Sequence, residues 1–377
     1  MKSLFVYGML LLIAMGASCD PVLGDGVNSV VKKATLQYTL DRDEDDIKEV
    51  SWNADGSLIA TTGTNSFSMW NSATGKLLYT IRKHSPRAEV HVSWSPDGMR
   101  IATSSDEYAP AGFDIGLISI RNAIDGEVIW TLGKNITLST PHCMSWSADG
   151  KYLSTSEGGL INIWNPDKGY LHNTVRGHTD YVRHIYWSTK SNSTLSASQN
   201  EIIIWNSIAD EKLFTLNGHT SRINDIDLSS DGTRVVSGSM DKNAIIWEVA
   251  TGKKLFTLVG HTYDINDVSW SPDCSKIITG ATDGGSIIWD ASTGIKLFRL
   301  EGSDQVTLTV AWSPDGKSVA MNSSKNASIW DASTGKKTLS LVGHSSGIQQ
   351  IRWSPDGKRI ATGSSDGTVK IWLVDEQ

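Results

Sequence analysis

The sequence predicts an all-β chain built from eight similar repeats of four short strands each. Three observations carry this prediction. Apolar strands that end in tryptophan recur at a nearly constant interval, a second tryptophan series runs beside them, and the same turn sequences follow each series. The 377 residues are 39% hydrophobic and 20% charged, as in an ordinary globular protein.

The first tryptophan series sets the length of the repeat. From Trp164 onward, successive members are separated by 41, 42, 42, 41 and 42 residues. Trp70 precedes Trp164 by 94 residues, which leaves room for one longer repeat, and there the strand LISIR carries Arg121 in the tryptophan position. The members of the series are Trp70, Trp164, Trp205, Trp247, Trp289, Trp330 and Trp372.

The second series places 14 of the 15 tryptophans in two repeat positions, with only Trp130 outside. We therefore interpret tryptophan as a framework residue of the repeat, not as a platform for stacking a ligand. The members of this series are Trp52, Trp94, Trp146, Trp187, Trp270, Trp312 and Trp353.

Turn sequences divide each repeat into four strands. Ser-Pro-Asp-Gly follows the second series at 95–98, 313–316 and 354–357, and Thr-Gly-Lys follows the first series at 74–76 and 334–336. Asp-Gly between apolar runs is a strong hairpin signal because glycine tolerates positive φ. One four-stranded sheet cannot bury both faces alone, so units of about 40 residues are expected to stack radially as the blades of a propeller.

The repeats resemble the WD40 family. Gly-His stands at 177–178, 218–219, 260–261 and 343–344, and Trp-Asp at 289–290 and 330–331. The resemblance covers residues 34–374. It implies a single eight-bladed WD40 β-propeller with four antiparallel strands per blade, whose ring closes when the N-terminal strand at 34–40 pairs with the last blade.

The resemblance also implies a buried His–Ser/Thr–Asp–Trp tetrad in three repeats. Its members also suggest a Ser-His-Asp catalytic set, but the set recurs once per repeat and an indole completes it, so we expect a structural role. Repeat four keeps His178 but has Gln199 in the Asp position, and the irregular repeats are expected to rely more on packing. The tetrads are His219, Ser237, Asp241 and Trp247; His261, Thr279, Asp283 and Trp289; and His344, Thr362, Asp366 and Trp372.

Recognition is expected on the propeller face that carries the Gly-His loops, called the His-loop face below. By the resemblance, the residue three positions after each His lines the mouth of the central channel, and these positions differ between repeats. Repeat two adds a long loop at 106–114 with exposed aromatics, which is either a partner-binding loop or an Ω-loop packed on itself. The candidate partner-binding residues are Asp46, Tyr108, Phe113, Thr140, Tyr181, Arg222 and Asp264.

The N-terminus has the basic, apolar and small-residue layout of a secretory signal. We expect a signal peptide at 1–18, a flexible tether at 19–33 and the propeller at 34–377. Cys19 follows Gly-Ala-Ser as in a bacterial lipoprotein cleavage site, so it is a candidate for lipidation and the only expected contact with a membrane. The chain should then be exported to a periplasm, a cell surface or the medium.

Charge and motif content narrow the function. A formal net charge of −7 argues against a nucleic-acid partner. The acidic run at 41–46 lacks a calcium-loop pattern, and the three cysteines lack metal-ligand spacing, so no metal is expected. No cofactor is expected either. No catalytic residue is expected, because the Ser/Thr-His-Asp set recurs once per repeat. We predict an exported, non-catalytic scaffold that binds a protein or peptide. The alternatives are a structural subunit of an envelope complex, a propeller enzyme or a small-ligand binder; the oligomeric state is left open.

Overall fold

The computed structural model describes residues 31–41, 46–64, 66–82, 90–108, 114–133, 141–188, 193–301 and 306–376. Every regular element of these residues is a β-strand, and the strands form eight four-stranded antiparallel sheets. The sheets are the eight blades of a β-propeller, as predicted. The expected signal peptide and Cys19 lie outside the described residues.

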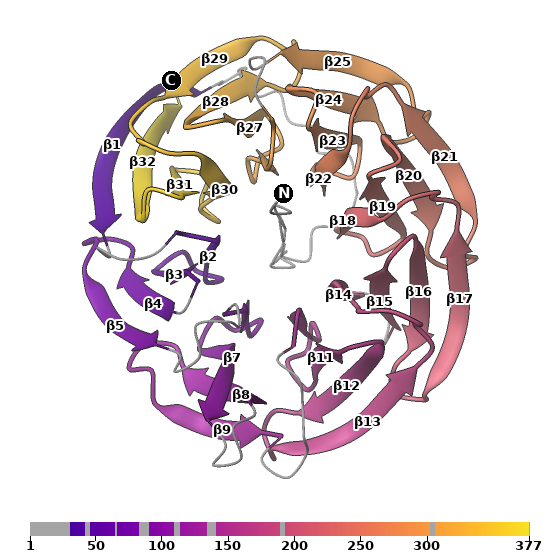
Figure 1. Cartoon of the computed structure of the whole chain (residues 1–377). Coiled ribbons are helices and arrows are strands. Elements are labelled where there is room, and N and C mark those ends of the chain that lie inside the picture. Colours follow the sequence, from indigo (N-terminus) through magenta and orange to yellow (C-terminus); the bar gives the residue numbers. More distant parts are fainter. Residues whose placement is uncertain are drawn as a thin grey trace. The chain divides into compact units, whose positions relative to one another are not determined.

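The chain divides into two compact units. The first, from Ser51 to Asn217, holds blades 1 to 4 (Figure 1). Their strands are β2 (Glu49–Trp52), which begins just before the unit, β3 (Leu58–Thr62), β4 (Ser66–Asn71) and β5 (Leu77–Arg82); β6 (Val92–Trp94), β7 (Arg100–Tyr108), β8 (Asp114–Asn122) and β9 (Val128–Leu132); β10 (Met144–Trp146), β11 (Leu153–Glu157), β12 (Leu160–Asn165) and β13 (Tyr170–Arg176); β14 (His184–Trp187), β15 (Ser193–Ser198), β16 (Glu201–Asn206) and β17 (Glu211–Asn217).

The second unit joins the N-terminal strand to blades 5 to 8, from Gly218 onward. Its strands are β18 (Ile223–Leu228), β19 (Arg234–Ser239), β20 (Asn243–Glu248) and β21 (Lys254–Val259); β22 (Ile265–Trp270), β23 (Lys276–Ala281), β24 (Gly285–Asp290) and β25 (Lys296–Glu301); β26 (Val310–Trp312), β27 (Ser318–Ser323), β28 (Asn326–Asp331) and β29 (Lys337–Leu341); β30 (Ile348–Trp353), β31 (Arg359–Ser364), β32 (Thr368–Glu376) and β1 (Val31–Asp41).

Burial changes across each blade, because the inner strands are covered on both faces and the outermost strand is not. In blade 6, β24 is buried over Gly285–Trp289, whereas most residues of β25 are exposed or half-buried. A strand covered on both faces typically contains a continuous run of apolar residues. In β24 this run is Ile287-Ile288-Trp289. Figure 1 shows β22 to β25 side by side in chain order.

The hydrophobic core lies between successive blades. One cluster joins Val236 and Ile246 of blade 5 to Val268, Trp270 and Trp289 of blade 6. The next cluster joins Ile288 of blade 6 to Trp312 of blade 7, and comparable clusters link later and earlier neighbours. Blades 6 and 7 therefore each contribute to two cores, and tryptophans of both series lie in these clusters.

The aromatic residues of the outer strands cover glycines of the following blade. A Cβ built on Gly169 would lie 2.7 Å from Cε3 of Trp130, and one built on Gly294 would lie 2.9 Å from Cγ of Phe256. Gly169 also has φ +70, which favours glycine. Trp130, which stands outside both tryptophan series, thus packs on the turn of the next blade.

The N-terminal strand β1 pairs antiparallel with β32, as the resemblance implied. Leu36 lies opposite Trp372, and Val31 lies opposite Glu376. The strand therefore begins three residues before the predicted propeller start at Ala34. Residues 31–33 belong to it and not to the predicted tether, because β32 extends far enough to offer them partners.

The long loop predicted at 106–114 is largely a hairpin extension. β7 and β8 stay paired from Arg100 opposite Asn122 to Tyr108 opposite Asp114. The loop proper is shorter than expected, because strand pairing supplies backbone partners that a free loop would lack. Residues 109–113, with the predicted partner-binding Phe113, lie outside the described residues.

Candidate functional site

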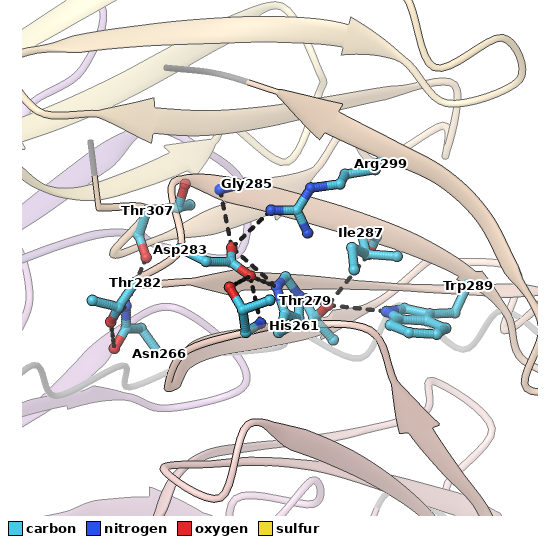
Figure 2. Close-up of polar contacts among 11 residues, drawn as sticks. His261, Asn266, Thr279, Thr282, Asp283, Gly285, Ile287, Trp289, Arg299 and Thr307 are labelled. Carbon is cyan, nitrogen blue, oxygen red and sulfur yellow. Dashed lines mark hydrogen bonds and ion pairs between the residues drawn. The ribbon is translucent and has the colours of Figure 1, made fainter. Parts of the chain in front are cut away.

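Blade 6 contains a buried tetrad that ties its strands together (Figure 2). The Nδ1 atom of His261 lies 3.0 Å from Oδ2 of Asp283, and its Nε2 lies 2.7 Å from Oγ1 of Thr279. The indole of Trp289 donates to the same hydroxyl at 2.9 Å. The His comes from the loop before β22, Thr279 from β23, Asp283 from the β23–β24 turn and Trp289 from β24.

The tetrad is a directed chain of hydrogen bonds. Burial lowers the pKa of His261, so its ring is neutral and carries one proton. A proton on Nδ1 faces the carboxylate, which leaves Nε2 to accept from the Thr279 hydroxyl. The pKa of the Asp283 carboxyl group is also lowered. Burial opposes this and is the largest single effect, but hydrogen bonds from the Thr262 amide at 2.9 Å and from His261, with the nearby Arg299 charge, together outweigh it.

The same direction of proton donation occurs in a Ser-His-Asp triad, yet this hydroxyl is not an available nucleophile. Thr279 is completely buried, and its oxygen already receives the indole N–H of Trp289. A substrate would have to enter the blade to reach it. The arrangement satisfies buried polar groups and holds the loop before β22 against the β23–β24 turn.

Blades 5 and 8 repeat this geometry at the residues that the sequence indicated. His219 lies 2.8 Å from Asp241 and 2.7 Å from Ser237, whose oxygen accepts from Trp247 at 2.9 Å. In blade 8 the distances are 2.9 Å between His344 and Asp366, 2.8 Å between His344 and Thr362, and 3.0 Å between Trp372 and Thr362.

Blade 4 has a complete tetrad that sequence analysis missed. His178 lies 3.0 Å from Oε1 of Glu201 and 2.7 Å from Ser196, which also accepts from Trp205. Glu201 lies two residues after Gln199, and its longer side chain reaches the histidine from the start of β16. The expectation that this blade relies more on packing is therefore wrong.

Blades 1 and 3 keep one hydrogen bond of the set. Trp70 donates to Thr61 at 3.0 Å, and Trp164 donates to Thr155 at 2.9 Å. In blade 2, Arg121 replaces the tryptophan, and its guanidinium donates to the Gly126 carbonyl at 3.0 Å. Polar contacts thus persist in these blades, although fewer than in the blades with a full tetrad.

Several members of the second tryptophan series join neighbouring blades by a hydrogen bond. The indole of Trp146 donates to the Ser93 carbonyl at 3.0 Å, and that of Trp270 donates to the Asp227 carbonyl at 3.1 Å. Trp312 reaches Ser269 in the same way at 3.1 Å. The sequence predicted that these tryptophans belong to the framework. It did not predict the carbonyls that accept their indole N–H groups, because those carbonyls belong to the preceding repeat.

Arg222 and Asp264 occupy equivalent places on the His-loop face of blades 5 and 6. Each comes directly before the innermost strand of its blade, and each backbone carbonyl accepts an amide from the loop between the second and third strands, at 2.9 Å in both cases. Tyr263, the residue before Asp264, is 59% exposed. The Lys242 ammonium lies 5.7 Å from the centre of the Tyr263 ring. Asp46, before β2, forms an ion pair with Lys48 at 3.5 Å.

The other predicted partner-binding residues are only partly described. Tyr181 of blade 4 is 53% exposed, and its ring meets that of His142 edge-on at 5.3 Å between centroids. Tyr108 ends β7. Thr140, like Phe113, lies outside the described residues.

Two other kinds of site were sought. Within the described ranges, His, Cys, Asp and Glu side chains form no group of three or more suited to a metal ion. The same ranges contain no helix long and apolar enough to cross a membrane.

Comparison with known proteins identifies the repeats. The profile of the WD domain, G-beta repeat family matches six segments: 75–108, 127–165, 169–206, 210–248, 252–290 and 335–372. Together they cover more than half of the chain. Two blades seen in the structure, the first and the seventh, fall largely outside these matches.

Individual relatives are distant. The chain is 23% identical to the WD repeat-containing protein srw1 of Schizosaccharomyces pombe, over 64% of this chain and 49% of that protein. It is 25% identical to the anaphase-promoting complex subunit cdc20 of Dictyostelium discoideum, over 57% and 51%. It is also 25% identical to the eukaryotic translation initiation factor 3 subunit I of Culex quinquefasciatus, over 52% and 62%.

The matched region spans about half the length of the first two relatives. The repeat profile, the eight four-stranded blades and the tetrads nevertheless agree with one another. The chain belongs to the WD domain, G-beta repeat family.

Proposed function

We propose that this protein is a non-catalytic scaffold that binds a protein or peptide through the His-loop face of its blades. The observation that carries the proposal is the contrast between a constant framework and variable loop positions. Arg222 and Asp264 have the same backbone contacts but opposite charges. Such positions can change to suit a partner without disturbing the blade.

Two further observations support a binding role. Tyr181 and Tyr263 each follow the histidine of the Gly-His pair in their own blade and expose more than half of their surface, and tyrosine is enriched where proteins bind partners. Two of the relatives are by name subunits of larger assemblies, the anaphase-promoting complex and translation initiation factor 3. Among the described residues, the arrangement most like a catalytic set is the tetrad, whose hydroxyl is buried.

The test compares partner capture by matched variants. Tagged wild type, Arg222→Ala with Asp264→Ala, and Tyr181→Ala are each used to capture proteins from the native cells. Lys253→Ala with Lys336→Ala, at the turns on the opposite end of the blades, is the control. We expect a defined set of proteins that the His-loop variants lose and the control retains, with all variants equally folded by circular dichroism.

Two results would overturn the proposal. Equal capture by all variants would exclude the His-loop face, and co-purification of a small molecule without protein would favour a ligand-binding propeller. A stoichiometric assembly that needs both ends of the blades would favour the structural-subunit alternative.

We also propose that the chain is exported, with residues 1–18 removed and Cys19 a candidate lipid attachment site. The basic, apolar and small-residue layout of the N-terminus supports this. Intact mass measurement of protein from native cells is the test. A chain that starts at Cys19 with the added mass of a lipid supports anchoring, a chain cleaved nearby without it supports secretion, and a retained Met1 overturns export.

A further inference from the structure

Buried carboxyl groups join the innermost strands of blades 5, 6 and 7. Asp225 on β18 accepts the amide of Val268 on β22 at 3.1 Å. Asp267 on β22 accepts the amide of Val310 on β26 at 2.7 Å. Each side chain therefore bridges its own blade to the backbone of the next blade.

A third carboxyl group, that of Asp227, makes a parallel bridge to the amide of Trp270 at 2.7 Å. Asp225, Asp227 and Asp267 are only 0%, 1% and 3% exposed. The Oδ1 atoms of Asp227 and Asp267 receive no hydrogen bond from the described residues. An ionised carboxylate buried in this way is costly because its lost hydration is not replaced.

The charged groups on the neighbouring strands give little compensation. β19 contributes Arg234, but its guanidinium stacks on the Trp270 ring and donates to the carbonyls of Ala291 and Cys274. β23 contributes Lys276 at its first residue, and β26 has no charged residue. The groups that face these carboxyls are chiefly one another.

This environment favours the protonated acids. Burial raises the pKa of Asp225 well above its usual value, and the Asp267 carboxylate raises it further by repulsion and by accepting its proton. Burial also raises the pKa of Asp227 to about 7. Blade 8 offers a neutral comparison, since Gln350 in the position of Asp225 and Asp267 accepts the Val50 amide with its side-chain oxygen.

We propose that the row of Asp225, Asp227 and Asp267 is a pH-responsive joint between blades 5, 6 and 7. In mildly acidic solution Asp225 and Asp227 bridge the strands as neutral acids. As pH rises these two groups ionise inside the joint, and the strands separate more readily. Arg222 and Asp264 lie three residues before two of these acids, so loosening of the joint would also reach their loops. The proposal stands independently of the proposed function.

The direction of the effect follows from linkage. The unfolded chain releases the protons of Asp225 and Asp227 near the ordinary aspartate pKa of 3.8, whereas the folded chain holds them longer. Their stabilising contribution is therefore complete below about pH 4 and is lost as pH rises through the folded pKa. Each such group changes the folding equilibrium by at most about tenfold per pH unit.

Buried histidines act in the opposite direction. Burial lowers the pKa of His219 and His261, so these residues weaken the fold as pH falls below about 6.5. The test must therefore use the difference between wild type and variant at each pH and not the absolute curve.

The experiment measures urea unfolding of the full chain from about pH 5 to about pH 8 for wild type and Asp225→Asn. Asparagine keeps the acceptor for the Val268 amide and gives Asp267 a permanent donor. We expect the folding equilibrium constant of the variant, relative to wild type, to increase by up to about tenfold per pH unit. The variant should be the more stable protein at the alkaline end.

Asp264→Asn, which removes a partly exposed carboxylate just before β22, is the control and should show a constant difference. A constant or decreasing difference for Asp225→Asn would overturn the proposal. If Asp225→Asn does not fold, Asp227→Asn should show a gain in stability relative to wild type that levels off near pH 7.

Hydrogen exchange of the backbone amides of residues 265–270 in wild type gives a second readout. Protection corrected for the intrinsic exchange rate should fall as pH rises, and pH-independent protection would contradict the joint.

Discussion

The Thr279 hydroxyl is the point at which the blade 6 tetrad can be tested most cleanly. Thr279→Val keeps the shape and the β-branched strand preference of the side chain but removes its oxygen. Trp289 Nε1 and His261 Nε2 then lose their partner, at 2.9 and 2.7 Å respectively, inside a blade. An unsatisfied buried polar group costs about 1–3 kcal/mol, so two of them predict a loss of about 2–6 kcal/mol.

The assay is equilibrium unfolding in urea, followed by tryptophan fluorescence and by circular dichroism so that agreement of the two probes checks the two-state treatment. Thr257→Val on β21 is the matched control. Thr257 is exposed, and this substitution should change the free energy of unfolding by less than about 0.5 kcal/mol. If Thr279→Val costs no more than Thr257→Val, the tetrad is not the structural device described above.

Four further outcomes are expected. Gly169→Ala should lower the melting temperature far more than Gly158→Ala, because both glycines have positive φ but only Gly169 has Trp130 over it; equal shifts would show that this contact is unimportant. Glu201→Ala should cost about 1–2 kcal/mol in urea unfolding by removing the partner of His178, and Glu201→Gln should restore part of it. His219→Gln should flatten the loss of stability as pH falls from about 7 to about 5, because burial lowers the pKa of folded His219 and the unfolded histidine takes up a proton more readily; an unchanged pH profile would refute this. Deleting residues 31–41 should expose the edge of β32 and lower the melting temperature, and unchanged melting would refute the role of β1.

The repeat architecture could be predicted because it depends on local signals that recur. Tryptophan spacing, Asp-Gly turns and Gly-His pairs each specify a part of one blade. Their recurrence along the chain makes the repeat recognisable even where one signal is absent. The tetrads at His219, His261 and His344 could be located for the same reason, since their members keep a fixed spacing.

The sequence could not reveal contacts made by departures from the repeat. Glu201 replaces an aspartate from two residues away, because a longer side chain can reach the same histidine from a different starting point. The blade-to-blade bonds of Trp270 and Asp225 depend on which residues of the next repeat lie opposite, and a single repeat does not contain that information. The extension of β7 and β8 was missed because residues 106–108 carry turn-like polar and acidic side chains, whereas backbone pairing decides the strand.

Photo-crosslinking in native cells tests the central claim of the account most directly. A photoreactive amino acid is placed at Arg222 on the His-loop face in one protein and at Lys253, at the opposite end of the same blade, in another. The account predicts a discrete crosslinked protein partner from position 222 and none from position 253. Crosslinks only from position 253, or none from either position while the protein is folded and in its native compartment, would contradict a scaffold that binds through the His-loop face.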